Sequence, residues 1–319
     1  MNPIIPSPVP IPLPAPPWLI HLLQLLTFVL HLVFMNLLVG GTVILTLSCY
    51  LGRKDVRHRD LARRAARALP PVVAFTITLG VAPLLFLQLA YGQLFYTTSV
   101  LMAWSWLAIV LFLMLAYYGV YWFNMQQEEL GPRGLWVMLG VTLLLLQIMK
   151  TFTQNLTLVE RPQDFYATFL IGPVGNYLGP HTAFVFARLS HFFVAALAIG
   201  GLGLAALSRS WSKDSPDFAA WARHYGLRWF LAGTGVQFIV GLWFLFSQPE
   251  PIRLALMGSD GLATSLLVIA IALAILAMMV ARKSLAAAAM GILGTVALMA
   301  VIRHLVRLAH LRPYFDVHA

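Results

Sequence analysis

The chain has 319 residues, of which 60% are hydrophobic and only 10% are charged, and its mean hydropathy is +0.83. Soluble domains carry about a quarter charged residues, so this composition excludes a soluble globular fold. The net charge of +10 does not indicate nucleic-acid binding, because the basic residues fall in short segments between apolar runs, where they set membrane topology. The single cysteine, Cys49, excludes a disulfide framework and a cysteine-ligated cluster.

The N-terminal segment is rich in proline and precedes the first apolar run. Residues 2–17 carry eight prolines, which favours an extended polyproline-II arm. This arm is either a stiff lead-in to the first helix or a strap that docks a partner subunit. It lacks a basic region and a small-residue cleavage site, so we expect no signal peptide.

Apolar runs long enough to cross a bilayer recur along the rest of the chain. They predict an all-α polytopic membrane protein with about eight transmembrane helices in two four-helix bundles. The expected spans are 18–51, 70–95, 99–125, 133–156, 183–208, 227–247, 261–281 and 284–308. The resulting parts are an arm (1–17), a first bundle (18–156), a loop (157–182), a second bundle (183–308) and a tail (309–319).

The basic residues predict the orientation. The segment 52–69 holds seven of them and should face the cytoplasm. Threading the other spans from there places fourteen Lys and Arg residues in the cytoplasm and five outside, while Lys150 and Arg188 fall within spans. Both termini and the loop 157–182 should therefore be extracytoplasmic. The expected location is the inner (cytoplasmic) membrane of a bacterial or archaeal cell.

Under this topology seven of the nine histidines lie toward the outer side. A metal-binding side chain in a membrane helix is costly unless it has a function, and a set at one depth indicates a cofactor. Haem b is the first candidate, because it takes His or Met as axial ligands. We favour His31 and His191 as iron ligands over buried hydrogen-bonded histidines. His21 is better explained as a polar boundary residue than as a ligand, and His304 and Met299 are the candidates for a second axial ligand.

Two cations within the spans could bind the haem propionates. Arg188 precedes His191 by three residues, so the two share a helix face. Lys150 lies in LLLLQIMKTFTQNL, and an ammonium at that depth needs an anion. No carboxylate occurs in its own span, and Glu160 falls in the expected outer loop. A propionate is therefore the preferred partner of Lys150.

Three segments resemble a known family. LLTFVLHLVFMNLLVGGTVI is similar to the first helix of cytochrome bd quinol oxidase subunit I, and TLGVAPLLFLQLAYGQLFY is similar to its second. RLSHFFVAALAIGGLGLAAL resembles the fifth helix, where a basic residue precedes the histidine ligand of the low-spin haem b by three positions. The resemblance covers roughly residues 20–210. It implies that His31 and His191 are haem ligands and that Arg188 assists His191.

The chain also departs from that family. Gln88, which we expect to face the His31 pocket, stands where the family has a glutamate, and a glutamine does not relay protons. The segment 248–260 is too short for the family's quinol-binding loop. The last three spans show no clear match to the family's methionine and late glutamate ligands. These differences count against oxygen reduction more than against haem binding.

The sequence therefore predicts an oxidoreductase subunit that binds two or more b haems. It would pass electrons between the quinone pool and an extracytoplasmic c-type cytochrome, and would assemble in the lipid bilayer with other membrane subunits, such as a subunit II-like protein. One alternative is a quinol oxidase that reduces oxygen at the His31 haem. Another is a cofactor-free transporter or assembly subunit whose buried charges pair internally.

Overall fold

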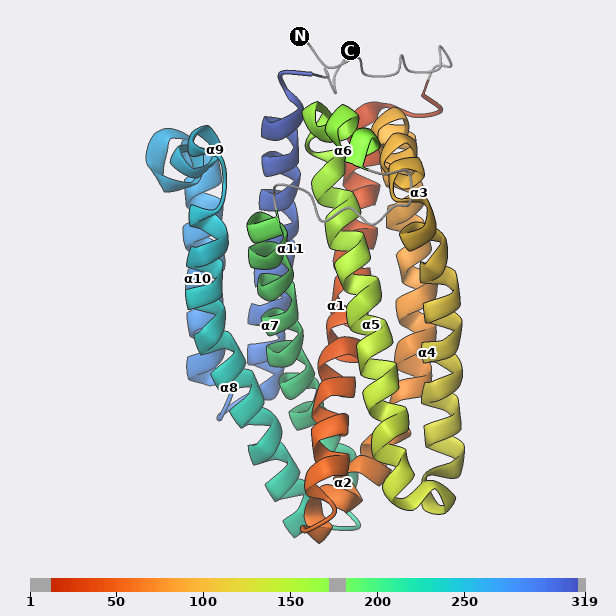
Figure 1. The fold of residues 1–319 in the computed structure, drawn as a ribbon. Coiled ribbons are helices and arrows are strands. Elements are labelled where there is room, and N and C mark those ends of the chain that lie inside the picture. Colours follow the sequence, from red (N-terminus) through yellow and green to blue (C-terminus); the bar gives the residue numbers. More distant parts are fainter. Residues whose placement is uncertain (1–12, 172–181, 315–319) are drawn as a thin grey trace.

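The computed structural model describes residues 13–171 and 182–314, and within these ranges every regular element is a helix (Figure 1). Eight of the described helices are long and apolar enough to cross a membrane, which confirms the predicted class. They are α1 (Pro17–Leu51), α3 (Leu69–Leu101), α4 (Ala103–Leu130), α5 (Gly134–Val159), α7 (Thr182–Leu207), α8 (Pro216–Phe246), α10 (Gly261–Val280) and α11 (Leu285–Leu311). Most of the proline-rich arm, His181 and His318 lie outside the described residues.

The connections contain more structure than hydropathy predicts. Besides single 3-10 turns, the described connections contain three short α-helices: α2 (Val56–Ala66), α6 (Phe165–Ile171) and α9 (Glu250–Leu254), the last followed by a π-helical turn. Several of the spans also extend further than predicted. For example, α8 begins eleven residues before the expected start at 227. Its first turns carry charged residues and lie outside the apolar window, so a hydropathy signal does not detect them.

The helix α2 lies in the arginine-rich segment that was predicted as a loop. Asp55 caps its N-terminus by accepting a hydrogen bond from the backbone N–H of Arg57 at 2.9 Å. His58 attaches the helix to α8, with its ring 5.1 Å from the Trp221 ring and 5.0 Å from the Tyr225 ring. Burial in this position lowers the pKa of His58, so the imidazole is neutral at pH 7.

The long helices form two halves whose main contact is between α1 and α7, and α11 also packs against α1. The first half contains α1, α3, α4 and α5, and the second contains α7, α8, α10 and α11 (Figure 1). The closest approach is between Gly40 of α1 and Gly200 of α7, because a Cβ at Gly40 would overlap the backbone carbonyl of Ala196. Lipid provides no hydrophobic force between helices, so small residues stabilise such a contact by allowing dense packing. Gly40 of the VGGT segment thus allows the close packing of α1 against α7.

Polar side chains add bonds between helices of the first half. Thr46 of α1 lies 3.0 Å from Thr142 of α5 between their hydroxyl oxygens. Asn155 of α5 donates its amide N–H to the Thr98 hydroxyl of α3 at 3.2 Å. The beginning of α1 and the end of α11 lie at the same end of the molecule (Figure 1). This end, called the outer end below, is opposite the arginine-rich α2.

Candidate functional site

The His31 site lies between α1 and α3. The Nδ1–H of His31 donates to the backbone carbonyl of Thr76 at 3.1 Å. A carbonyl only accepts, so this bond places the ring proton on Nδ1 and leaves Nε2 unprotonated. Gly80, one turn beyond Thr76, faces the ring, and a Cβ at Gly80 would lie 2.8 Å from Cε1 of His31. The imidazole is therefore tightly held against α3.

The His191 site lies between α7 and α8. The side-chain amide nitrogen of Gln237 is 2.8 Å from Nδ1 of His191 and 3.2 Å from its Nε2. Gly241, one turn beyond Gln237, faces this ring, and a Cβ there would lie 3.7 Å from Cε1 and Nδ1. The ring of Phe244 closes the site at 5.6 Å from the imidazole. The contact with the glycine is looser than at His31.

The two sites have the same construction in the two halves of the molecule. In each, the histidine lies on the first helix of its half and is followed nine and ten residues later by a glycine pair, Gly40–Gly41 or Gly200–Gly201. In each, the next transmembrane helix supplies a hydrogen-bond partner and, four residues later, the glycine that faces the imidazole. The pattern His-x8-Gly-Gly is an internal repeat that the sequence analysis missed.

The repeat also places both histidines at one depth. The helices α1 and α7 run in the same direction and make contact at Gly40 and Gly200. Each histidine precedes that contact by nine residues, which is about 13 Å along a helix at 1.5 Å per residue. Both imidazoles therefore lie on the outer side of the crossing point. Cofactors held by them would lie side by side and would not form a wire across the membrane.

A buried ionic cluster lies at the outer end, around Glu160, which caps α5. The Nη2 of Arg188 donates to Oε2 of Glu160 at 2.5 Å, and Nη1 donates to the Thr157 hydroxyl at 3.1 Å. The Nε of Arg307 from α11 lies 3.9 Å from Oε1 of Glu160, beyond hydrogen-bond length. Glu160 and Arg307 are each 2% exposed, and Arg188 is 3% exposed.

This cluster corrects one expectation. Glu160 was assigned to an outer loop, but it is buried, because α5 continues to Val159 and places it among the helices. Arg188 lies one helical turn from His191 and pairs directly with the Glu160 carboxylate. Its expected contact with a propionate stays a prediction.

The outer end holds more cations than anions. Arg303 stacks on the Phe28 ring, with 4.6 Å from its Cζ to the ring centroid, and Arg307 lies 5.2 Å from the Tyr91 centroid in the same way. Both arginines were counted among the outer basic residues, yet Arg307 is fully inside the bundle. With Arg188 they make three guanidinium groups around Glu160. Within the described residues, Nε of Arg307 and Oε1 of Glu160 are buried without a hydrogen-bond partner.

Two further histidines meet at this end. The ring centroids of His21 from α1 and His304 from α11 are 4.9 Å apart, and His21 is 6.0 Å from the Tyr91 ring. His304 is thus placed with His21 and not with His191 or His31. Met299, the other candidate for an axial position, packs against an apolar cluster of α9, α10 and α11 that includes Ile302.

The remaining predicted residues lie apart from the histidines. Lys150 is half-buried in α5, and no carboxylate of the described residues lies within ion-pair distance of it. Gln88 accepts a hydrogen bond from the hydroxyl of Tyr96, on its own helix, at 3.3 Å. It lies eight residues beyond Gly80, and no hydrogen bond in the described chain joins it to His31. The described residues contain no group of three or more His, Cys, Asp or Glu side chains that would hold a metal ion alone.

Gln237, Glu160, Arg303 and Arg307 are the residues that sequence reasoning did not place in the site. Arg303 and Arg307 are four residues apart in an apolar helix that also carries His304. Ionisable residues in such a helix indicate a functional site inside the bundle. Gln237 carries a weaker signal, as an amide within the apolar part of α8.

Comparison with known proteins gives one informative result. No protein-family model matches the sequence, and no curated protein matches it. Among solved structures, the chain is similar to a chain of the bd oxidase from Geobacillus thermodenitrificans, with a TM-score of 0.69 and 16% sequence identity over 95% of this chain and 90% of that chain. At this identity the match establishes a shared multi-pass helical fold. It confirms the resemblance to cytochrome bd oxidase that the sequence motifs indicate.

Proposed function

We propose that this protein is a haem-b-binding subunit of a cytochrome bd-like membrane oxidoreductase. The observation that carries the proposal is the pair of equivalent histidine sites at one depth, within a fold shared with a bd oxidase chain. Buried histidines that merely fill space have no reason to recur with the same spacing to a glycine pair and the same facing glycine. Two such positions correspond to two haems, one in each half.

The donor atoms fit haem iron. A metal-ligating histidine usually donates its other N–H to a carbonyl or carboxylate, and His31 does so to Thr76. At His191 the amide oxygen of Gln237 is buried without a partner in the described chain. Turning this amide by 180° would bring the oxygen to Nδ1, which would then donate, and Nε2 would be free for the iron. Bound haem would supply a one-electron carrier at each site.

The cations fit the propionates. Three arginines surround one carboxylate at the outer end, so a dianionic group would balance the charge that Glu160 leaves uncompensated. The Nε of Arg307 is buried and has no hydrogen-bond acceptor among the described residues. Lys150, which has no carboxylate partner in the described chain, is a further candidate for a propionate. Burying such cations without anions costs several kcal/mol per ion as an order of magnitude.

We further propose that quinone supplies or receives the electrons and that an extracytoplasmic c-type cytochrome is the other partner. The support is the position of the two histidines. Both lie toward the outer end, which shortens the path for electrons to a soluble protein that would bind there. A second candidate is a quinol oxidase, which the fold likeness to a bd oxidase favours. Two observations count against an oxidase. The amide of Gln88 cannot relay protons as a carboxylate does, and the Glu160 carboxylate is paired with two arginines.

The test is the spectrum of the purified protein. A dithionite-reduced absorbance α-band of b type, with a pyridine haemochrome giving two haems per chain, is expected. A cofactor-free transporter or assembly subunit would show no such band, and that result would refute the proposal. Oxygen uptake driven by quinol then separates the two electron-transfer readings. We expect little turnover with oxygen, and sustained uptake by the purified complex would establish the oxidase instead.

A further inference from the structure

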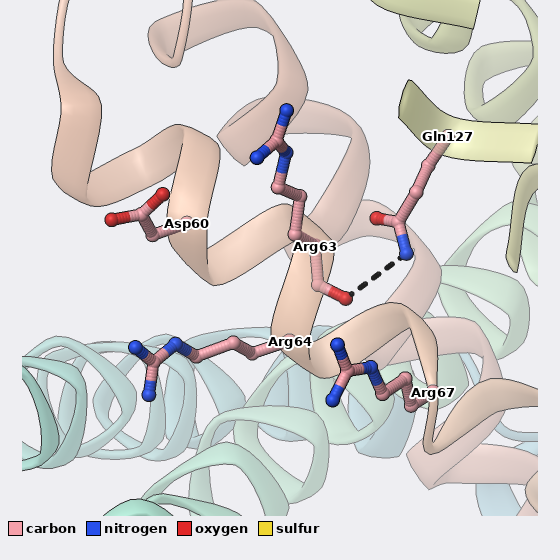
Figure 2. A pocket seen from close by; sticks show the side chains of 5 residues that line it. All are labelled: Asp60, Arg63, Arg64, Arg67 and Gln127. Carbon is pink, nitrogen blue, oxygen red and sulfur yellow. Dashed lines mark hydrogen bonds between the residues drawn. The ribbon is translucent and has the colours of Figure 1, made fainter. Parts of the chain in front are cut away.

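The arginine-rich end of the molecule contains a cleft that the proposed electron transfer does not use. Its volume is about 240 Å³, and it is lined by Asp60, Arg63, Arg64, Arg67 and Gln127 (Figure 2). Four of these residues belong to α2 or its C-cap, and Gln127 comes from the end of α4. The cleft is therefore formed by a helix that lies between the spans and one that crosses the membrane.

Contacts from α2 to α4 and to the start of α8 stabilise the shape of the cleft. Gln127 donates its amide N–H to the backbone carbonyl of Arg63 at 3.3 Å, which ties α4 to α2 (Figure 2). Arg64 donates to the Ser215 hydroxyl at 3.1 Å and stacks on the Phe218 ring at 4.6 Å. Arg64 thus fastens α2 to the start of α8. Arg63 and Arg67 are exposed, and the Arg63 side chain extends away from Gln127, which contacts only its backbone carbonyl (Figure 2).

The chemistry of the lining selects an anion with several oxygens. Three arginines and one carboxylate line the cleft, and each guanidinium has a planar fork of N–H donors that fits phosphate. The Gln127 amide adds an uncharged donor.

The position of the cleft indicates where such a phosphate comes from. Trp122 of α4 is 55% exposed and Trp136 of α5 is 65% exposed, both near the same end of the bundle. Exposed tryptophans gather at the level of the lipid headgroups. Basic pockets at that level bind the headgroups of anionic lipids.

We propose that this cleft binds the phosphate of an anionic phospholipid in the leaflet next to α2, which the charge distribution assigns to the cytoplasm. The bound lipid would join α2 to α4 at the boundary of the first half. The proposal is independent of haem binding.

The test compares two double variants of the same helix. Arg63→Gln with Arg67→Gln removes two exposed cations from the cleft. Arg57→Gln with Arg59→Gln removes two exposed cations from α2 outside it, at equal change in net charge. Retention of phosphatidylglycerol is measured by native mass spectrometry after release from nanodiscs that contain phosphatidylglycerol and phosphatidylcholine. We expect the cleft variant to retain about tenfold less phosphatidylglycerol, because it loses two guanidinium groups that would contact the phosphate. The control keeps both groups and should retain the lipid.

Equal losses in both variants would show that surface charge alone attracts the lipid, and would overturn the proposal. A thermal-shift series with inorganic phosphate tests the other source of the same chemistry. If free phosphate at millimolar concentration stabilises the wild-type protein as much as phosphatidylglycerol does, the lipid assignment fails. Arg64 is left intact because it holds α8. The single variant Arg67→Gln, with unchanged helical circular dichroism, is the fallback should the double variant not fold.

Discussion

The His31 and His191 sites differ in how firmly the protein holds each imidazole. At His31 the hydrogen-bond acceptor is a backbone carbonyl, and the facing Gly80 leaves no room for a methyl group. At His191 the partner is the side-chain amide of Gln237, and Gly241 makes only an ordinary contact. The backbone fixes one tautomer at His31, whereas the amide permits either at His191. We infer that the first site has a rigid ligand and that the second is the more adjustable.

The largest expected effect comes from replacing either histidine, which should remove the haem of that site. His191→Ala should remove one low-spin b component from the reduced spectrum, and His31→Ala should remove the other, each halving the haem content. The matched control is His224→Ala, an exposed histidine at the arginine-rich end, which should leave both components in place. Pyridine haemochrome on folded protein gives the count. An unchanged spectrum in His191→Ala would end the assignment of that ligand.

The ionic cluster beside His191 provides the next test. Glu160→Gln leaves Arg188 and Arg307 buried without their carboxylate, and breaking such a pair costs about 3–5 kcal/mol. The melting temperature in detergent should fall markedly and the His191 component should be lost before the His31 component. Glu129→Gln, on the exposed end of α4, is the control and should change stability by less than about 0.5 kcal/mol. A melting temperature that does not move would mean that the arginines are already balanced by another anion.

The two facing glycines sharpen the comparison directly. An alanine Cβ at Gly80 would lie 2.8 Å from His31, so Gly80→Ala must displace the ring, at a cost of about 1–3 kcal/mol for overpacking. The corresponding distance at Gly241 is 3.7 Å, so Gly241→Ala should be tolerated. Haem occupancy and the melting temperature of the two variants measure this difference. Equal effects would contradict the inferred rigidity of the first site.

Replacing the hydrogen-bond partner of each histidine should affect the His191 site more than the His31 site. Gln237→Leu removes the partner of His191 and should shift the midpoint potential of that haem, because the ligand loses the bond that sets its basicity. Thr76→Val is the control, since His31 bonds to the backbone carbonyl of Thr76 and the Thr76 hydroxyl bonds to Val72. Redox titration followed optically compares the two. A shift only in Thr76→Val would reverse our account of the partners.

The smallest expected effect is at Lys150. Lys150→Met should shift one haem potential or lower its occupancy, because a cation near a propionate stabilises the anionic group. If neither changes, the ammonium reaches the interface along its flexible stem. Because the lysine lies on α5 of the first half, we expect the shift in the His31 component.

Much of this architecture was predictable from local sequence. The eight apolar runs define the spans, since a bilayer core demands about 20 consecutive apolar residues and every run meets that length on its own. His31 and His191 stand out for the same local reason, as metal-binding side chains within apolar helices. The repeat His-x8-Gly-Gly is also present in the sequence, although its meaning depends on the contact between Gly40 and Gly200.

The partners of these residues were decided only by the tertiary structure. Gln237 lies 46 residues after His191, and Arg188 and Arg307 reach Glu160 from two different helices. Hydropathy placed Glu160 in a loop because it follows the last apolar residues, but the packed helices enclose it and give it two cations. Span positions are set by each segment's own transfer into lipid. Pairings depend on the rotation and register of neighbouring helices, which no single segment encodes.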